Sequence, residues 1–146
     1  MTQSEQLGKD AQQFIEKFGL YFSEVGLARS VGRVLGLLLI CDPPHQSAEQ
    51  IQEKLQLSSG SVSSAVSVLN RMRMIKRTAE AGSRRLFYEL ETDCWTKVIE
   101  IRLQQVERGK RIAEEGLKLN KGNPRLLGMH DLYARFEELL RTLQHL

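Results

Sequence analysis

The pattern of hydrophobic and polar positions predicts six helices and one β-hairpin along the chain. Over residues 7–25, apolar side chains recur every three or four positions, which predicts an amphipathic helix that Gly26 ends. Residues 27–41 are apolar on nearly every side, as expected of a helix at the centre of a core. The Pro43-Pro44 pair stops this second helix, because residues that precede proline avoid the helical conformation.

Two shorter helices follow, and serine side chains are placed to cap both of them. Ser47 precedes a helix that is expected to end near Leu55, and Ser58 or Ser59 precedes one that ends near Met72. The apolar residues of this pair recur at helical steps and form an inward-facing set: Ile51, Leu55, Leu57, Val62, Val66 and Leu69. Two helices joined in this way by a short turn are typical of a helix-turn-helix motif.

A β-hairpin is predicted after the helix-turn-helix. Its strands cover residues 75–78 and 85–90, and Gly82 between them supplies the freedom that a hairpin turn needs. Alternate residues of the second strand share a face, with Leu86 and Tyr88 on one side and Arg85 and Phe87 on the other. Strands at this place form the wing of a winged helix-turn-helix. The predicted fold class is therefore mainly α with a small β-hairpin wing.

Two long amphipathic helices complete the chain. The first is expected to begin at Thr92 or Asp93 and to end near Leu119, and the second begins at Asn123-Pro124, a cap followed by proline. The apolar stripe of the last helix is predicted to contain Leu126, Met129, Tyr133, Phe136, Leu140 and Leu143. The terminal helices carry more apolar surface than one small winged helix can cover. Burial against a second copy across a two-fold axis would cover it.

Composition places the chain among ordinary globular proteins. Its 146 residues are 41% hydrophobic and 27% charged, which suits one domain with a proper core. The longest apolar run, residues 34–41, is too short to cross a bilayer, so no membrane association is expected. The N-terminal residues are polar and show no signal segment, which predicts a cytoplasmic location.

Positive charge is concentrated on the helix-turn-helix and the hairpin. Residues 58–88 contain six basic residues and one acidic residue, a net charge of +5, whereas the whole chain is +3. The rest of the chain is therefore −2. A basic module on a nearly balanced protein indicates a polyanionic partner such as DNA.

The candidate DNA-binding residues lie on the second helix of the motif and on the hairpin. Short hydroxyl side chains let a helix approach a groove closely and can bond phosphates or base edges. Arg84 and Arg85 follow the hairpin turn, where a wing would meet the phosphate backbone or the minor groove. The full set is Ser58, Ser59, Gly60, Ser61, Ser63, Ser64, Ser67, Asn70, Arg71, Arg77, Ser83, Arg84 and Arg85.

The chain resembles the MarR family of bacterial transcriptional regulators, and within it the GbsR-like branch. The resemblance is carried, in this order, by four segments: GLARSVGRVLGLLLICDPP (residues 26–44), SAEQIQEKL, SSGSVSSAVSVL and GSRRLFYEL. It implies one MarR-like domain over residues 1–146, with a winged helix-turn-helix lobe at 27–91 and dimerisation helices at 7–25 and 92–146. It further implies an obligate homodimer on a near-palindromic site in double-stranded DNA, acting as a sequence-specific regulator and a repressor.

A small-molecule effector is a further implication of the resemblance. GbsR-like proteins are associated with osmoprotectant genes, and choline-like cations suit aromatic cages, which makes Phe18, Tyr21, Phe22 and Trp95 candidates. The alternative is that these aromatics belong to the core, as a stripe at helical spacing usually does.

Other chemistries find little support in the sequence. Cys41 and Cys94 could form a redox switch, but their apolar neighbours favour burial. No spacing matches a metal site or a catalytic motif, so neither a cofactor nor enzymatic activity is expected. The rival function is a winged helix that binds only proteins, and the charge of the 58–88 segment argues against it.

Overall fold

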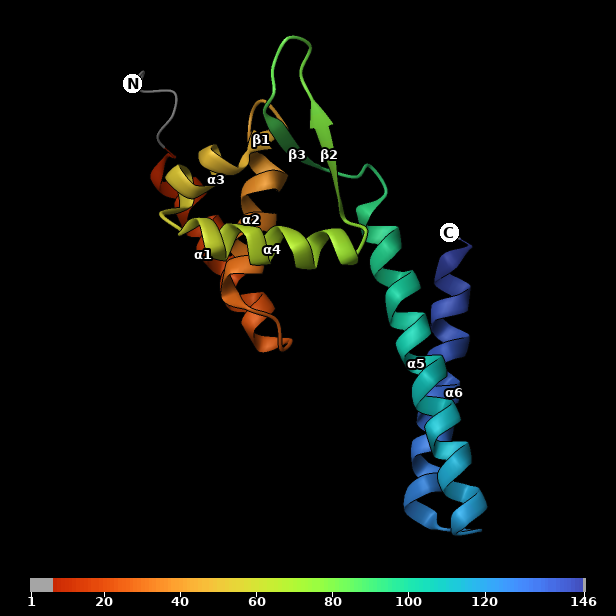
Figure 1. Cartoon of the computed structure of the whole chain (residues 1–146). Helices are drawn as coiled ribbons and strands as arrows, with labels where there is room; N and C mark the ends of the chain where they lie inside the picture. Colours follow the sequence, from red (N-terminus) through yellow and green to blue (C-terminus); the bar gives the residue numbers. More distant parts are fainter. Residues whose placement is uncertain (1–6, 146) are drawn as a thin grey trace. The chain divides into compact units, whose positions relative to one another are not determined.

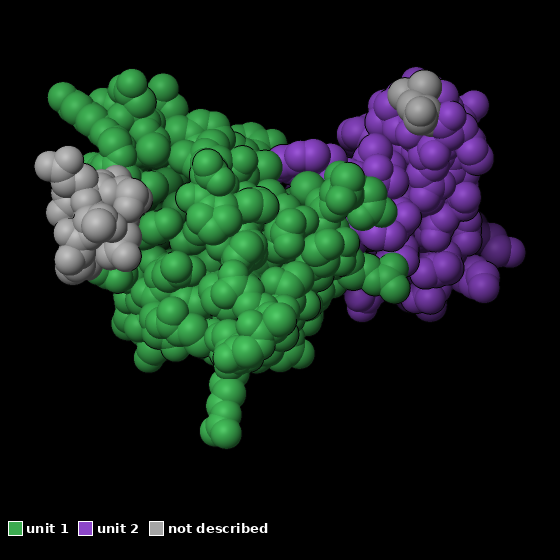
Figure 2. Space-filling view, turned by 90° about the horizontal axis from the view of Figure 1, so that it is seen from above, with its two compact units in different colours: residues 1–94 green, residues 95–146 purple. Residues whose placement is uncertain are grey.

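The computed structural model describes residues 7–145 and divides the chain into two compact units. Figure 2 colours them separately, unit 1 over residues 1–94 and unit 2 over residues 95–146. Unit 1 contains four helices and a small sheet, and unit 2 contains two long helices (Figure 1). None of the helices within residues 7–145 has a stretch long and apolar enough to cross a membrane.

The helices of unit 1 follow the predicted pattern. They are α1 (Lys9–Glu24), α2 (Arg29–Ile40), α3 (Ala48–Leu55) and α4 (Ser59–Arg71). The predicted position of α2 at the centre of the core is confirmed, since all but one of its residues from 31 to 38 are buried. Gly26 adopts a positive φ of 86° after α1, a conformation that glycine reaches without strain.

The close approach of α1 and α2 depends on two glycines of α2. A Cβ atom on Gly32 would lie against the carbonyl oxygen of Phe18 and 2.8 Å from the Cβ of Phe22. A Cβ on Gly36 would lie 3.3 Å from the Cα of Ile15. Helix backbones can approach this closely only where one of them has no side chain, so α1 packs directly on the α2 backbone.

The pair α3 and α4 forms the predicted helix-turn-helix. The Gln50 N–H donates to the Ser47 hydroxyl over 3.2 Å, and the Ser47 N–H donates to the Gln50 side chain over 2.8 Å, which completes a capping box. Within the predicted inward-facing set, Ile51, Leu55, Val62 and Leu69 are buried, whereas Leu57 and Val66 are half-buried. Ala65 is fully buried as well and completes the α4 side of the packing.

The sheet has three antiparallel strands in the order β1-β3-β2. The strands β2 (Ile75–Ala79) and β3 (Leu86–Leu90) form the predicted hairpin, and β1 (Gln46–Ser47) pairs with β3. Phe87 is the buried residue of β3, while Leu86 is exposed. The two-residue β1 was not predicted, because it is too short to show any alternation of its own.

Unit 2 is a hairpin of α5 (Cys94–Leu119) and α6 (Pro124–Gln144). The Asn123 side chain caps α6 by accepting from the Arg125 N–H over 2.9 Å, as its position before proline predicted. Two side chains of α6 pack on glycines of α5: Tyr133 lies over Gly109, and Leu126 lies over Gly116. The two helices thus pack on each other at positions where α5 has no side chain.

The apolar residues of α6 differ in how far they are covered. Tyr133 and Leu140 face α5 and are half-buried, together with Leu126 and Met129. Phe136 and Leu143 of the predicted stripe are less covered. Both are exposed, and they line up with other exposed apolar residues in the set Leu132, Phe136, Leu139 and Leu143.

Candidate nucleic-acid interface

The outward face of α4 is a surface of small, uncharged side chains. Of the predicted contact residues on this helix, all but one are exposed: Ser59, Gly60, Ser63, Ser64, Ser67, Asn70 and Arg71. The exception is Ser61, which is half-buried. The exposed set contains no acidic residue, and one end of it carries the positive charge of Arg71. Such a helix can approach a polyanion closely without electrostatic repulsion.

The first turn of α4 is held by Ser58 and Ser61. The Ser61 N–H donates to the Ser58 hydroxyl over 3.1 Å, and the two hydroxyl oxygens lie 3.0 Å apart in a second hydrogen bond. These side chains therefore stabilise the N-terminus of the helix. Because their hydroxyls already form these hydrogen bonds, Ser58 and Ser61 differ in role from the exposed serines of α4.

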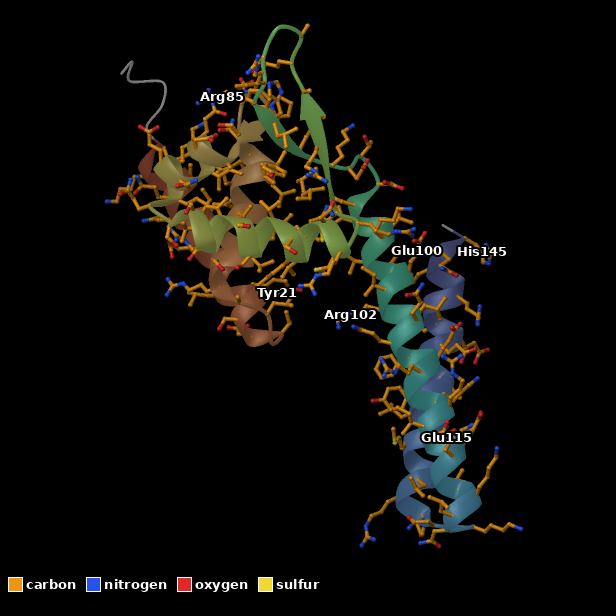
Figure 3. All side chains as sticks on the ribbon, viewed as in Figure 1. Tyr21, Arg85, Glu100, Arg102, Glu115 and His145 are labelled. Atoms are coloured by element: carbon orange, nitrogen blue, oxygen red, sulfur yellow. The ribbon has the colours of Figure 1, made fainter. Side chains whose placement is uncertain are left out.

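The loop between β2 and β3 carries the predicted wing arginines. Arg84 and Arg85 are exposed, and Figure 3 shows Arg85 at the wing. Ser83 is half-buried and shapes the turn, because its hydroxyl accepts from the Arg85 N–H over 3.1 Å. Gly82 has the positive φ, 80°, that the turn requires. The wing thus presents two guanidinium groups at its edge.

His45 anchors the wing to the body of unit 1, a role that was not predicted from the sequence. His45 Nε2 lies 2.9 Å from a carboxylate oxygen of Glu80, which follows β2. The His45 ring also meets the buried Phe87 ring edge to face, with centroids 5.1 Å apart. The segment before β1 is thereby linked to both strands of the hairpin. The sequence did not predict the contact between His45 and Glu80, because the two residues are 35 positions apart.

Arg77 of β2 and Tyr88 of β3 are the residues of the wing that stand beside α4. They face each other across the β2–β3 ladder, and with Ser63, Val66, Ser67 and Asn70 they line a hollow of about 190 Å³. Arg77 is one of the predicted contact residues. Tyr88 was not among them, because only the strand register shows that it stands beside the guanidinium.

An ion-pair network joins α1, α2 and α3. Glu16 of α1 binds Arg29 and Arg33 of α2 at 2.6 and 2.9 Å, and Arg33 also donates to the backbone carbonyl of Leu55 over 2.9 Å. Partial burial alone would raise the pKa of the Glu16 carboxyl, but the hydrogen bonds and charges of both arginines outweigh it and lower the pKa. Arg33 therefore ties the end of α3 to α1.

The predicted aromatic effector residues are divided between the two units. Phe18, Tyr21 and Phe22 form a cluster on α1 with ring centroids 6.1 to 6.4 Å apart. Phe22 is buried against α2, whereas Tyr21 is exposed and is labelled in Figure 3. Trp95 belongs to unit 2, where half of its surface is exposed.

Both cysteines have surroundings that suit a structural role. Cys94 is buried, and burial raises the pKa of the Cys41 thiol despite the opposing charge of Lys54. A raised thiol pKa lowers the fraction of reactive thiolate. Among residues 7–145, no three histidine, cysteine or acidic side chains are grouped as metal ligands would be.

An exposed helix-turn-helix face beside a basic wing defines the class of winged-helix DNA-binding proteins. No protein-family model matches the chain. The HTH-type transcriptional regulator MmpR5 of Mycobacterium tuberculosis is 34% identical over 136 residues, 90% of this chain and 82% of that protein. A crystal structure of a transcriptional regulator is 33% identical, with a TM-score of 0.80 over 93% of this chain and 96% of the other. The chain belongs to the MarR family of helix-turn-helix transcriptional regulators.

Proposed function

We propose that this protein is a repressor that binds a near-palindromic site in double-stranded DNA as a homodimer. The observation that carries the proposal is the acid-free outward face of α4 beside the exposed wing arginines. The net charge of +5 over residues 58–88 would draw this face to the phosphate backbone, since each phosphate contact releases condensed counterions. Winged-helix proteins place such a helix in the major groove.

The proposed contacts divide between the helix and the wing. One face of α4 carries residues that follow one another at steps of three or four positions: Gly60, Ser64, Ser67 and Arg71. This face would enter the major groove, flanked by Ser59, Ser63 and Asn70. Arg84 and Arg85 would bind phosphates or the minor groove. Ser58, Ser61 and Ser83 would contribute mainly by shaping the backbone, because their hydroxyls already make internal hydrogen bonds.

A second copy of the chain is the proposed partner of α6. Leu132, Phe136, Leu139 and Leu143 are exposed at steps of four, three and four residues, the spacing of a helix-packing seam. Symmetric burial of this seam would pair two helix-turn-helix lobes, which suits half-sites about one DNA turn apart or a small multiple of it. In this arrangement α1, α5 and α6 form the dimerisation region, and residues 27–91 form the DNA-binding lobe of one MarR-like domain.

We further propose that the protein belongs to the GbsR-like branch and that it is located in the cytoplasm. A choline-like cation is the proposed regulator. The branch assignment rests on the four segments between residues 26 and 90 that resemble GbsR-like proteins. The cation would bind the aromatic rings of α1, Phe18, Tyr21 and Phe22, of which Tyr21 is exposed. Binding would favour one of two dimer shapes and release the DNA. Isothermal titration with choline and glycine betaine, against Tyr21→Ala as control, tests this part alone.

Selection of binding sites from random duplex DNA, followed by gel shifts at two salt concentrations, tests DNA recognition. We expect a near-palindromic motif and an affinity that falls steeply as salt rises. Arg84→Ala should weaken binding to every sequence about equally, because a phosphate contact carries no sequence information. The absence of binding to any duplex, even at low salt, would overturn the proposal in favour of a winged helix that binds proteins.

A further inference from the structure

We propose that the hollow between α4 and the wing binds one backbone phosphate of the DNA duplex, with Arg77 and Tyr88 as its principal ligands. This inference rests on the proposed function, because the phosphate belongs to the bound operator. It adds a contact that fixes the wing and the helix on the same DNA strand. Tyr88 is the new member of the DNA-binding surface.

The lining residues come together through two regular spacings. On α4, the lining residues that follow Ser63 lie three, four and seven positions after it: Val66, Ser67 and Asn70. All four therefore form one stripe along the helix. On the sheet, Arg77 of β2 is paired directly with Tyr88 of β3, and paired residues point to the same face. The helix stripe and this cross-strand pair form opposite walls of a hollow of about 190 Å³.

The polar lining consists of groups that can all donate hydrogen bonds to an anion. It contains one guanidinium, the hydroxyls of two serines and one tyrosine, and one amide, and no carboxylate. Within residues 7–145, none of these five side chains forms a hydrogen bond or an ion pair. The acidic residue of β3, Glu89, is paired with Lys76 and therefore lies on the other face of the hairpin. The hollow thus has positive charge and several donors, which is the chemistry of a phosphate site.

The position of the hollow identifies which phosphate it would hold. If α4 lies in the major groove and the wing reaches the adjacent minor groove, one sugar-phosphate strand must pass between them. The hollow is the concave surface between α4 and the wing, so that strand would run over it. A phosphate held there would set the register of the helix in the groove without reading any base.

The first test compares two charge deletions on neighbouring positions of β2. Arg77→Ala removes the proposed ligand, and Lys76→Ala removes the same charge from an exposed position on the opposite face of the strand. Binding of the full chain to its selected operator is measured over a series of KCl concentrations. Arg77→Ala should flatten the slope of log affinity against log salt by about 0.9 per lobe, or about 1.8 for a dimer. Lys76→Ala should leave the slope closer to that of the unaltered protein. Equal slopes for the two variants would overturn the proposal.

The second test locates the phosphate on the DNA. Operators are prepared in which one phosphate at a time is replaced by an uncharged methylphosphonate. We expect one position in each half-site where this replacement weakens the unaltered protein but has no further effect on Arg77→Ala. Tyr88→Phe, which removes only the hydroxyl, should weaken binding by about three- to tenfold with an unchanged salt slope. A scan in which no position depends on Arg77 would contradict the inference.

A third arm distinguishes a DNA phosphate from a free anion. Inorganic phosphate, at an ionic strength matched with KCl, should neither displace the operator nor perturb the NMR signals of the Tyr88 ring. Perturbation without DNA would overturn the assignment in favour of a free-anion site. If the unaltered protein binds no duplex at all, the proposed function fails together with this inference. Normal operator binding with an unaffected salt slope in Arg77→Ala removes only the phosphate site.

Discussion

Replacement of Gly32 by alanine tests the packing of α1 on α2, on which unit 1 depends. Two effects oppose each other in this substitution. An alanine inside a helix is favoured over glycine by about 0.5–1 kcal/mol, because the unfolded glycine chain has more freedom to lose. Against this, the new methyl group would lie against the Phe18 carbonyl oxygen and 2.8 Å from the Phe22 Cβ.

The steric cost should exceed the gain, because the nearest obstacle is backbone. A flexible side chain could rotate away from the methyl group, but the Phe18 carbonyl moves only if α1 as a whole moves. Overpacking of this kind costs about 1–3 kcal/mol, and a backbone obstacle places Gly32→Ala at the upper end of that range. We therefore expect a net destabilisation of about 2 kcal/mol, which is about a 30-fold change in the folding equilibrium.

Two other glycines provide a graded comparison. The nearest heavy atom to a Cβ on Gly60 of α4 would be 4.0 Å away, so Gly60→Ala should be neutral or slightly stabilising. Gly36→Ala would meet the Phe18 Cβ at 3.1 Å and should fall between the other two. The free energy of unfolding is measured by urea denaturation with circular dichroism, at one protein concentration because dimer formation would contribute to it. If Gly32→Ala is as stable as Gly60→Ala, the packing argument is wrong.

Three further predictions concern the cap, the ion-pair network and the α6 seam. Ser47→Ala removes the capping box of α3 and should lower the free energy of unfolding by about 1 kcal/mol in urea denaturation, and an unchanged value would contradict the role of the cap. Because the folded pKa of Glu16 lies below its unfolded value, its contribution to stability is complete above the unfolded pKa and is lost as the pH falls through the lowered value. Urea midpoints of Glu16→Gln measured from neutral to acidic pH should therefore show a shallower loss than the unaltered protein, and parallel curves would contradict the assignment. Leu139→Glu should convert the protein to monomers in analytical ultracentrifugation, because it would place a charge in the exposed seam of α6. The same change at exposed Leu119, outside the seam, should leave the dimer intact. An unchanged dimer in Leu139→Glu would exclude the seam from the interface.

The secondary structure could be predicted largely because its signals are local. Ser47 and Asn123 mark helix starts by hydrogen bonds to residues only two or three positions away, and such bonds depend on nothing distant in the chain. The buried α2 followed from its apolar composition alone. The exposure of Phe136 and Leu143 could not be predicted in the same way, because a wide apolar face does not show which of its residues are covered and which stay exposed.

The sequence by itself thus determined the order of the elements, the helix-turn-helix core and the concentration of positive charge on residues 58–88. Only the tertiary structure decided which side chains stand together at the candidate interface. The pairing of Arg77 with Tyr88, the contact of His45 with Glu80 and the bond from Arg33 to Leu55 join residues 11 to 35 positions apart. Strand register and helix packing set these contacts, and both arise from burial summed over whole elements, which no short stretch of sequence encodes.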